Sequence, residues 1–227
     1  MDLNPKADRN GHEAVGKLEA TWCLWEKYQS TNYQTRENYA QSMQIIYEFG
    51  TLDEFAAMWK HTSYGHPSTL FFDVQRFMSK RFALEEGDEE KVAESLLLFR
   101  KGVTPEWEDP ANKYGSSMVI EFKEATPAEI DEVWKSLVFG IVGNSFPHGE
   151  RVMGLRFLDR LKKHQQLKCE VWTSVPGRSS CKNKEEADVN EKLMDDIINH
   201  FHKLCSKTFS FSVHSITTKD HNVANKV

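Results

Sequence analysis

Short segments of the chain alternate hydrophobic and polar residues with a period of two, which is the pattern of a β-strand that buries one face. Segments of this strand-like composition lie at 18–28, 44–49, 95–100, 117–123, 152–158 and 167–173. A final segment near the C-terminus has its alternating hydrophobic residues at Phe209, Phe211 and Val213. The strands do not alternate regularly with helices, so the pattern favours antiparallel neighbours rather than a parallel sheet.

Three other segments repeat their hydrophobic residues at helical spacing. The first follows Thr51, an N-cap residue with two acidic residues in the next turn, and ends near His61. The second begins at Thr126-Pro127, with Pro at the first helical position, and ends near Val142. The third covers 190–204. Strands with three interspersed helices predict an α+β fold in which the helices cover one face of an antiparallel sheet.

The same pattern predicts one folded domain over 18–215. Residues 1–17 are polar and show no sustained period, which is typical of a disordered tail, and 216–227 is interpreted as a flexible C-terminal tail. An insertion at about 64–93 mixes aromatic residues with the acidic run 85–90. We interpret this insertion as a helical hairpin.

Composition narrows the class of protein. The chain has 227 residues, of which 39% are hydrophobic, so it can bury a large core. Its net charge of -5 argues against a protein that binds nucleic acid over its whole surface, because such domains are usually strongly basic. Four scattered cysteines, a polar N-terminus and the lack of a long apolar stretch predict a reduced, soluble protein of the cytoplasm, and the nucleus stays open as a second compartment.

Candidate chemistry concentrates at Trp107 and Glu108, in the acid-flanked segment 101–109. A 7-methylated guanine carries a delocalised positive charge, which an indole face attracts by stacking and cation–π interaction worth roughly 0.5–2 kcal/mol. Its N1 and N2 hydrogens lie along one edge, where a neighbouring carboxylate can accept both and offset the charge. The pair therefore indicates a binding site for a cationic purine.

A basic segment suits the phosphates of such a ligand. Residues 151–168 carry one Asp and six basic side chains, which are Arg151, Arg156, Arg160, Lys162, Lys163 and Lys168. The alternative is that these side chains form the solvated polar side of a hairpin.

Five segments have a recognisable order and spacing of tryptophans and turn residues. They are Trp22-Cys23-Leu24-Trp25, Phe49-Gly50-Thr51-Leu52-Asp53-Glu54-Phe55, Gly102-Val103-Thr104-Pro105-Glu106-Trp107-Glu108-Asp109, Gly143-Asn144-Ser145-Phe146 and Val171-Trp172-Thr173. In these segments the chain resembles the mRNA cap-binding proteins of the eukaryotic translation initiation factor 4E family, from about residue 18 to 213. The resemblance implies a curved sheet of about eight antiparallel strands, three helices on its convex face and a cap-binding slot on its concave face.

The resemblance also implies roles around the guanine base of the cap. Trp107 matches one stacking ring of the family, and Tyr39 falls where the other ring usually is a Trp, with Tyr33 as a second candidate in the same loop. Glu108 matches the residue that reads the guanine edge. Trp172 matches the residue that contacts the methyl group.

For the cap phosphates, Arg160 and Lys168 match the binding positions of the family. Lys162 and Lys163 lie in the loop between them, which is three residues longer than usual, and are further candidates. Near Ser117, where the family often has an arginine, this chain has none.

On the convex face the resemblance implies a groove for a partner peptide, from a scaffold initiation factor or a repressor. Its positions in this chain are Leu18, Leu52, Ala56, Trp134 and Lys135. Ala56 stands where the family has an exposed Trp, and Lys135 where it has a Leu, so the specificity of the groove should differ. The insertion at 64–93 resembles the extensions of divergent members from kinetoplastid protozoa, whose caps are further methylated.

The sequence therefore predicts a protein without a catalytic centre, cofactor or metal, which binds the 7-methylguanosine cap of mRNA and recruits it for translation initiation. A translational repressor or storage factor is the first alternative, because of Ala56. A protein-interaction domain that has lost cap binding is the second, because of Tyr39 and Ser117. An enzyme acting on capped nucleotides is the third, although no HExxH, GxGxxG or complete nucleophile motif is present.

Overall fold

The structure is a computed structural model. It describes residues 16–28, 42–68, 72–73, 78–79, 81–82, 91–122, 125–160, 166–206 and 215–221. Four predicted site residues, Tyr33, Tyr39, Lys162 and Lys163, lie outside the described residues, as does the strand predicted at 209–213.

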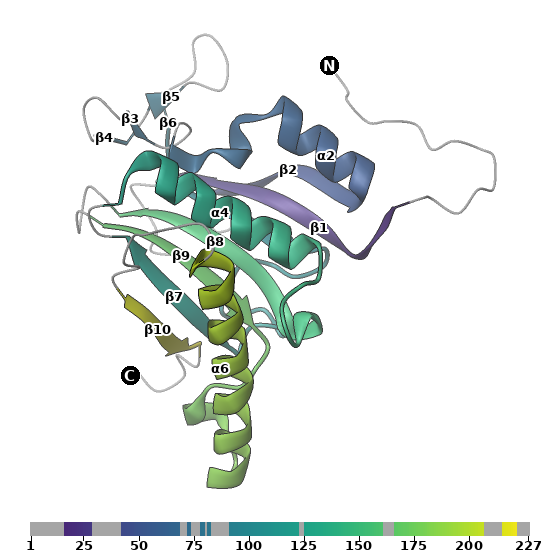
Figure 1. The fold of residues 1–227 in the computed structure, drawn as a ribbon, viewed down its shortest axis with the longest axis vertical. Coiled ribbons are helices and arrows are strands. Elements are labelled where there is room, and N and C mark those ends of the chain that lie inside the picture. Colours follow the sequence, from purple (N-terminus) through teal and green to yellow (C-terminus); the bar gives the residue numbers. More distant parts are fainter. Residues whose placement is uncertain are drawn as a thin grey trace, which may run out of the picture.

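One curved antiparallel sheet forms the centre of the molecule (Figure 1). Its strands are β1 (Lys17–Tyr28), β2 (Met43–Thr51), β5 (Arg81–Phe82), β6 (Lys91–Arg100), β7 (Ser116–Phe122), β8 (Val152–Arg160), β9 (Gln166–Thr173) and β10 (Ser215–Asp220). Their order in space is β10-β7-β9-β8-β6-β1-β2, with β5 paired to β6, and each pairing is antiparallel. The predicted antiparallel sheet is confirmed.

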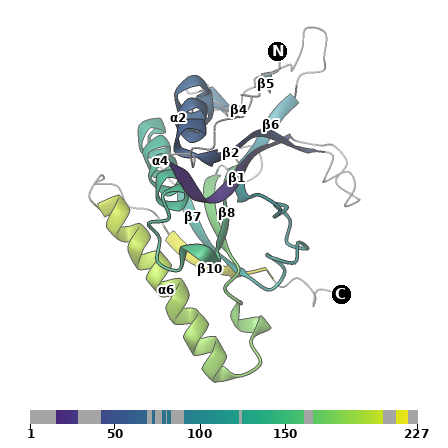
Figure 2. The same cartoon turned by 90° about the vertical axis from the view of Figure 1, so that its right-hand side faces the viewer.

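Three α-helices that the structure describes in full lie on one side of this sheet, and the long loop between β6 and β7 lies on the other (Figure 2). They are α2 (Leu52–His61), α4 (Pro127–Val142) and α6 (Lys184–Ser206). Thr51 and Thr126 begin α2 and α4 with complete capping boxes, in which the third helical residue, Glu54 or Glu129, bonds back to the cap. Both helix starts predicted from the sequence are confirmed. No helix in the described part of the chain is long and apolar enough to span a bilayer.

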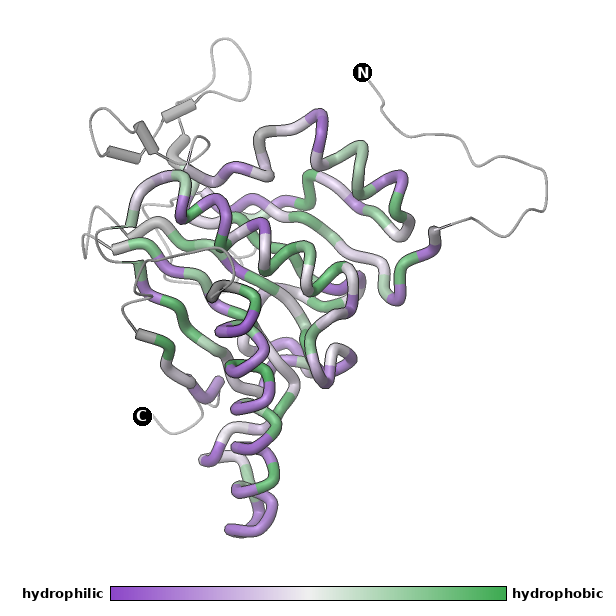
Figure 3. Tube along the Cα trace, viewed as in Figure 1, coloured by the Kyte–Doolittle hydropathy of each residue, from purple (hydrophilic) through white to green (hydrophobic). Residues whose placement is uncertain are grey.

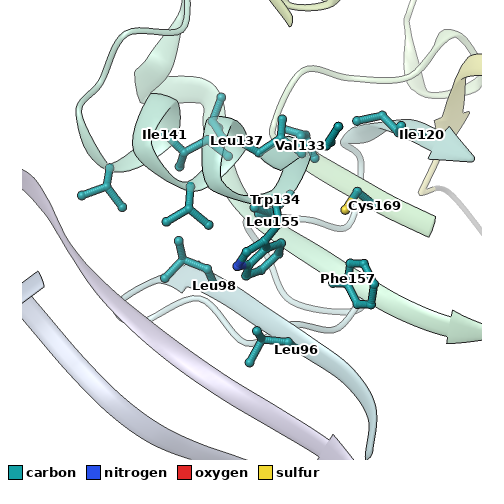
Figure 4. Packing of buried hydrophobic residues seen from close by; sticks show 14 of the residues in the cluster. Leu96, Leu98, Ile120, Val133, Trp134, Leu137, Ile141, Leu155, Phe157 and Cys169 are labelled. Carbon is teal, nitrogen blue, oxygen red and sulfur yellow. The ribbon is translucent and has the colours of Figure 1, made fainter. Parts of the chain in front are cut away.

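The main hydrophobic core fills the space between the helices and the convex face of the sheet. Trp134, Leu137 and Ile141 of α4 lie over Leu98 and Leu155 of the strands below (Figure 4). Each of these side chains is at least 96% buried, and burial of a large apolar side chain contributes about 1.5–3 kcal/mol to stability. The core therefore holds the sheet at a fixed curvature under α4.

The strand residues that alternate with those of the main core point to the concave face, where they form a second, smaller cluster. Leu97 and Phe99 of β6 and Trp172 of β9 are its buried members, and Trp25, Val103 and Trp107 pack against them. Trp25 points to the face opposite that of Trp22 and Leu24 and so joins the concave cluster.

Helix α6 begins six residues before its predicted start at residue 190. Its first turns are polar, as Figure 3 shows for most of the helix, so hydrophobic spacing did not mark them. Local bonds define its start instead, since the Asn183 side chain accepts from the backbone N–H of Glu186 at 2.8 Å.

The chain departs from the sequence prediction in two further places. Within the insertion, the described residues include η1 (Ser63–Gly65), the helical residues 67–68 and the two-residue strands β3 (Phe72–Asp73), β4 (Met78–Ser79) and β5. The predicted helical hairpin is wrong where these strands lie. At the C-terminus, β10 pairs with β7 in the segment assigned to a flexible tail from residue 216. The strand was missed because its exposed residues are Thr and Lys, without an apolar alternation.

Candidate functional site

The loop at 101–115, between β6 and β7, carries the candidate residues Trp107 and Glu108. It leaves β6 through Gly102, whose φ of 86° lies in the left-handed region that favours glycine. It rejoins β7 after Gly115, where a Cβ atom would collide with the carbonyl oxygen of Thr173. A side chain at either position would therefore strain the backbone or collide with it, which explains why both residues are glycine.

Two polar side chains hold the loop in one conformation. Asp109 accepts from the backbone N–H groups of Thr104 at 2.8 Å and of Ala111 at 2.9 Å. Asn112, which is fully buried, donates from Nδ2 to the carbonyl oxygens of Thr104 and Glu106, both at 2.9 Å. Because buried backbone groups are costly to leave unpaired, these bonds make the loop a fixed support rather than a mobile one.

On this support Trp107 is half-buried and Glu108 is exposed. The Trp107 ring lies 6.3 Å from the ring of Trp172, measured between centroids, at an interplanar angle of 36°. The indole is thus anchored on the concave cluster, and the carboxylate next to it reaches solvent. The structure brings Trp107, Glu108 and Trp172 together at one place on the concave face.

Trp172 forms the floor beneath the loop. Its side chain is only 1% exposed and meets Phe99 edge to face, with centroids 5.4 Å apart. Its Nε1 donates to Oε2 of Glu170 at 3.0 Å. In this structure Trp172 is therefore close to the site but largely covered, so a contact with a ligand requires a neighbouring side chain to move.

His221 is one of the covering residues and was missed by the sequence interpretation. Its backbone N–H donates to the carbonyl oxygen of Gly115, and its Nδ1 donates to that of Asn112 at 3.0 Å. Its ring is 4.6 Å from Trp172 and stacks on Trp107 at an angle of 13°. Burial lowers the pKa of His221, which keeps the ring neutral.

Lys219 is the second missed neighbour of Trp107. Its Nζ lies 4.1 Å from the centroid of the Trp107 ring, within the range of a cation–π contact. No sequence pattern marked it, because its position depends on the pairing of β10 with β7, in which Lys219 lies opposite Ser117.

Buried charges continue along the concave face beyond Trp172. Arg156 and Glu170 are opposite one another in the β8–β9 pair, and both are at least 91% buried. Next to them the ammonium of Lys27 donates to Glu94 at 3.1 Å, and a guanidinium nitrogen of Arg156 is 4.0 Å from that carboxylate. Opposite charges thus offset one another on the floor of the sheet.

Of the predicted phosphate-binding residues, the structure describes the side chain of Lys168. It projects from the same face of β9 as Trp172 and pairs with Glu121 at 2.7 Å. Four residues of strand separate the two positions, about 13 Å. The backbone of Arg160 ends β8 opposite Gln166, and its side chain lies outside what the structure describes.

The five predicted groove residues of the convex face fall into two groups. Leu52 is 53% exposed, Ala56 is exposed, and Lys135 is half-buried beside Glu132, with which it forms an ion pair. Leu18 and Trp134 are buried, and the Trp134 Nε1 donates to the carbonyl oxygen of Tyr64 at 2.9 Å. The side chain of Trp134 thus supports the helices from inside rather than lining a surface.

One aromatic residue that the sequence interpretation missed, Phe139, lies between α2 and α4. Phe139 is 48% exposed and packs against Trp59 at 4.9 Å and Phe55 at 5.2 Å between centroids. Helical spacing could not show that Phe139 of α4 stays half-exposed beside Trp59 of α2. The convex face therefore has an apolar surface even with Ala56 in place of a Trp.

Fold and site together define a class of protein with a curved antiparallel sheet, helices on its convex face and an aromatic loop on its concave face. Residues 17–227 match the family model of eukaryotic initiation factor 4E, and the chain belongs to this family.

Individual relatives are distant. The chain is 25% identical over 193 residues to eukaryotic translation initiation factor 4E1 of Drosophila melanogaster, covering 83% of this chain and 60% of the relative. It is 27% identical to factor 4E-1 of Schizosaccharomyces pombe over 161 residues, or 69% of this chain and 67% of the relative. The chain thus spans less than two thirds of the length of the Drosophila relative.

Solved structures share the fold. Ascaris suum eIF4E-3 in complex with m7G cap superposes with a TM-score of 0.63 at 19% identity, over 91% of each chain. Caenorhabditis elegans eIF4E-3, in complex with the 4E-binding protein Mextli and a cap analog, gives a TM-score of 0.63 at 17% identity, over 92% of this chain and 94% of that one.

Proposed function

We propose that this chain binds the 7-methylguanosine cap of mRNA on its concave face and recruits the mRNA for translation initiation. The observation that carries this proposal is the fixed loop that presents a half-buried indole, Trp107, beside an exposed carboxylate, Glu108. A cationic guanine stacks on the indole, while its N1 and N2 hydrogens bond to the carboxylate. Charge-assisted bonds of this kind are about twice as strong as neutral ones.

The remaining roles follow from the position of the base. Tyr39 supplies the second stacking ring, and Trp172 contacts the methyl group once the base has entered beside Trp107. A contact of this type favours the methylated base, because the methyl group is buried against an aromatic surface.

The phosphates of the cap bind to four basic residues, which are Arg160, Lys162, Lys163 and Lys168. The ion pair between Lys168 and Glu121 is partly exposed to solvent, so it contributes little to stability and an incoming phosphate can exchange with the carboxylate. The distance of about 13 Å along β9 from Trp172 to Lys168 suits a base at one end and an extended phosphate chain at the other.

On the convex face we propose a docking surface for a peptide of a scaffold initiation factor or a repressor. The 4E-binding protein in the C. elegans complex supports this part of the proposal. The exposed surface around Leu52, Trp59 and Phe139 offers the apolar contacts, and Lys135 adds a charge that selects among peptides. We place the protein in the cytoplasm, and we assign it no catalytic step.

A second candidate is a repressor or storage factor that holds the cap without recruiting a scaffold. Ala56 favours it, because an exposed alanine on α2 offers a partner much less apolar area than an aromatic ring would. Pull-down of native partners separates the two functions, since only a recruiting factor brings a scaffold factor with it.

Retention on a resin that carries 7-methyl-GTP tests the proposed function. We expect the wild-type chain to be retained and to elute with free 7-methyl-GTP but not with GTP. Trp107→Ala should lose retention, because its stacking interaction is worth about 1–3 kcal/mol. Phe139→Ala is the matched control, since it removes an aromatic ring from the convex face, and it should be retained like the wild type.

The opposite pattern would contradict the proposal. Retention of Trp107→Ala equal to that of the wild type, or elution by GTP as readily as by its methylated form, would mean that the loop does not bind a cationic guanine.

A further inference from the structure

We propose that Lys219 sets how strongly this chain distinguishes the methylated base from the unmethylated one. The side chain holds a positive charge against the ring on which the base stacks, and so lowers the preference for a base that is itself positive. This inference rests on the proposed function and adds to it a specificity-determining residue from the last strand.

The position of Lys219 is fixed by the sheet. In the register of β10, β7 and β9, Lys219 lies opposite Ser117, and Ser117 lies opposite Trp172. The three residues thus form one row across neighbouring strands, on the face that carries Trp107. From this row the ammonium extends to 4.1 Å from the centroid of the Trp107 ring.

Neighbouring residues keep the end of β10 in place. The N–H of His221 donates to Gly115 at 2.9 Å, which ties the strand end to the loop of Trp107. Asp220 alternates to the other face of the strand, where its carboxylate accepts from the N–H of Ser179 at 3.0 Å. The ammonium of Lys219 is therefore held beside the indole of Trp107 by a strand that is paired in the sheet.

The strand order shows from which side the ring is approached. The loop that carries Trp107 runs from β6 to β7, while β10 lies beyond β7 and β1 and β2 lie beyond β6. Lys219 and His221 therefore come from the β10 side of the loop.

A cation close to an aromatic ring draws on the same π electrons that attract a second cation to that ring, and the two positive charges also repel one another. A 7-methylated guanine carries such a charge, whereas guanine does not. Lys219 therefore disfavours the methylated base relative to the unmethylated one. The same ammonium attracts the phosphates of both nucleotides, so its effect on the affinity for either one alone has two opposing parts.

The ratio of two affinities separates these parts. 7-Methyl-GTP and GTP have the same number of phosphates, so the attraction between Lys219 and the phosphates cancels in the ratio of their dissociation constants. What remains is the effect of the ammonium on the charge of the base.

We would measure both dissociation constants by calorimetry for the wild type, Lys219→Gln and Lys219→Arg. The preference for 7-methyl-GTP over GTP should rise about two- to fivefold in Lys219→Gln, from loss of one partly screened cation near the ring. It should stay unchanged in Lys219→Arg, which keeps the charge. Lys113→Gln is the matched control, because the ammonium of Lys113 lies over Tyr114 and not over Trp107, and it should not alter the preference.

Two results would overturn the inference, and they can be told apart. If the wild type prefers 7-methyl-GTP and Lys219→Gln leaves the preference unchanged or lowers it, Lys219 does not set the selectivity while the proposed function stands. If neither the wild type nor Lys219→Gln prefers the methylated nucleotide, the proposed function itself fails. Because Lys219 is exposed, its variants should fold, and equal thermal unfolding curves would verify this.

Discussion

At the scale of single residues, the site depends on groups that support Trp107 rather than on Trp107 alone. Asn112 fixes the loop, and Trp172 and His221 pack against the indole. The sequence indicated Trp107, Glu108 and Trp172 as candidates, because an indole beside a carboxylate and a motif of known spacing can be recognised from the order of residues alone. It did not identify Lys219 or His221, since their contact with Trp107 exists only after β10 has paired with β7.

The burial of His221 predicts a pH dependence of stability. Its pKa is lowered in the folded state below the ordinary value of 6.5, mainly because burial disfavours the charged ring. As the pH falls below 6.5, the unfolded chain takes up a proton at this residue before the folded chain does. The free energy of unfolding should therefore decrease with falling pH in that window.

Urea unfolding of the wild type and of His221→Gln measures this effect. It is done at about pH 7.5 and about pH 5.5, which lie about one pH unit above and below the ordinary pKa of histidine. The wild type should lose more stability than the variant on acidification. His61→Gln is the control, because His61 is exposed on α2, and it should behave like the wild type. An equal loss in wild type and His221→Gln would show that His221 is not buried as a neutral ring.

At the scale of elements, the starts of α2 and α4 and most strands could be predicted because they depend on local signals. The capping boxes at Thr51 and Thr126 were visible as residue types at fixed spacing, and six strands followed from their composition. The C-terminal strand could not be predicted in this way. β10 is at the edge of the sheet, where polar residues are tolerated, and its pairing with β7 across more than 90 residues is a tertiary contact.

The capping box of α4 allows a test at this scale. Thr126→Ala removes the side-chain oxygen that accepts from Glu129, and it should lower the free energy of unfolding by about 0.5–1 kcal/mol. Thr126→Ser keeps the hydroxyl and should lose much less. Urea unfolding at neutral pH measures both variants. Equal losses in the two variants would mean that the methyl group of Thr126, not the cap, accounts for the effect.

At the scale of the whole molecule, the sheet separates two surfaces. The concave face carries the aromatic loop and the buried charges, while the convex face carries the helices and the half-exposed ring of Phe139. The core between α4 and the strands joins them through rigid packing, so binding on one face can occur without disrupting the other. This arrangement suits a protein that holds a nucleotide on one face and a peptide on the other.

The central claim is that Glu108 and Trp107 together bind a cationic guanine. It is tested most directly by titrating 7-methyl-GTP into wild type and Glu108→Gln while following tryptophan fluorescence. Glutamine keeps the shape of the side chain but loses its charge and one acceptor. Glu185→Gln, which neutralises an exposed carboxylate at the start of α6, is the control.

We predict saturable quenching in the wild type and in Glu185→Gln. In Glu108→Gln we predict binding weaker by about ten- to a hundredfold, the range expected for loss of a hydrogen bond to a charged group. Binding of 7-methyl-GTP to Glu108→Gln with the affinity of the wild type would contradict the claim.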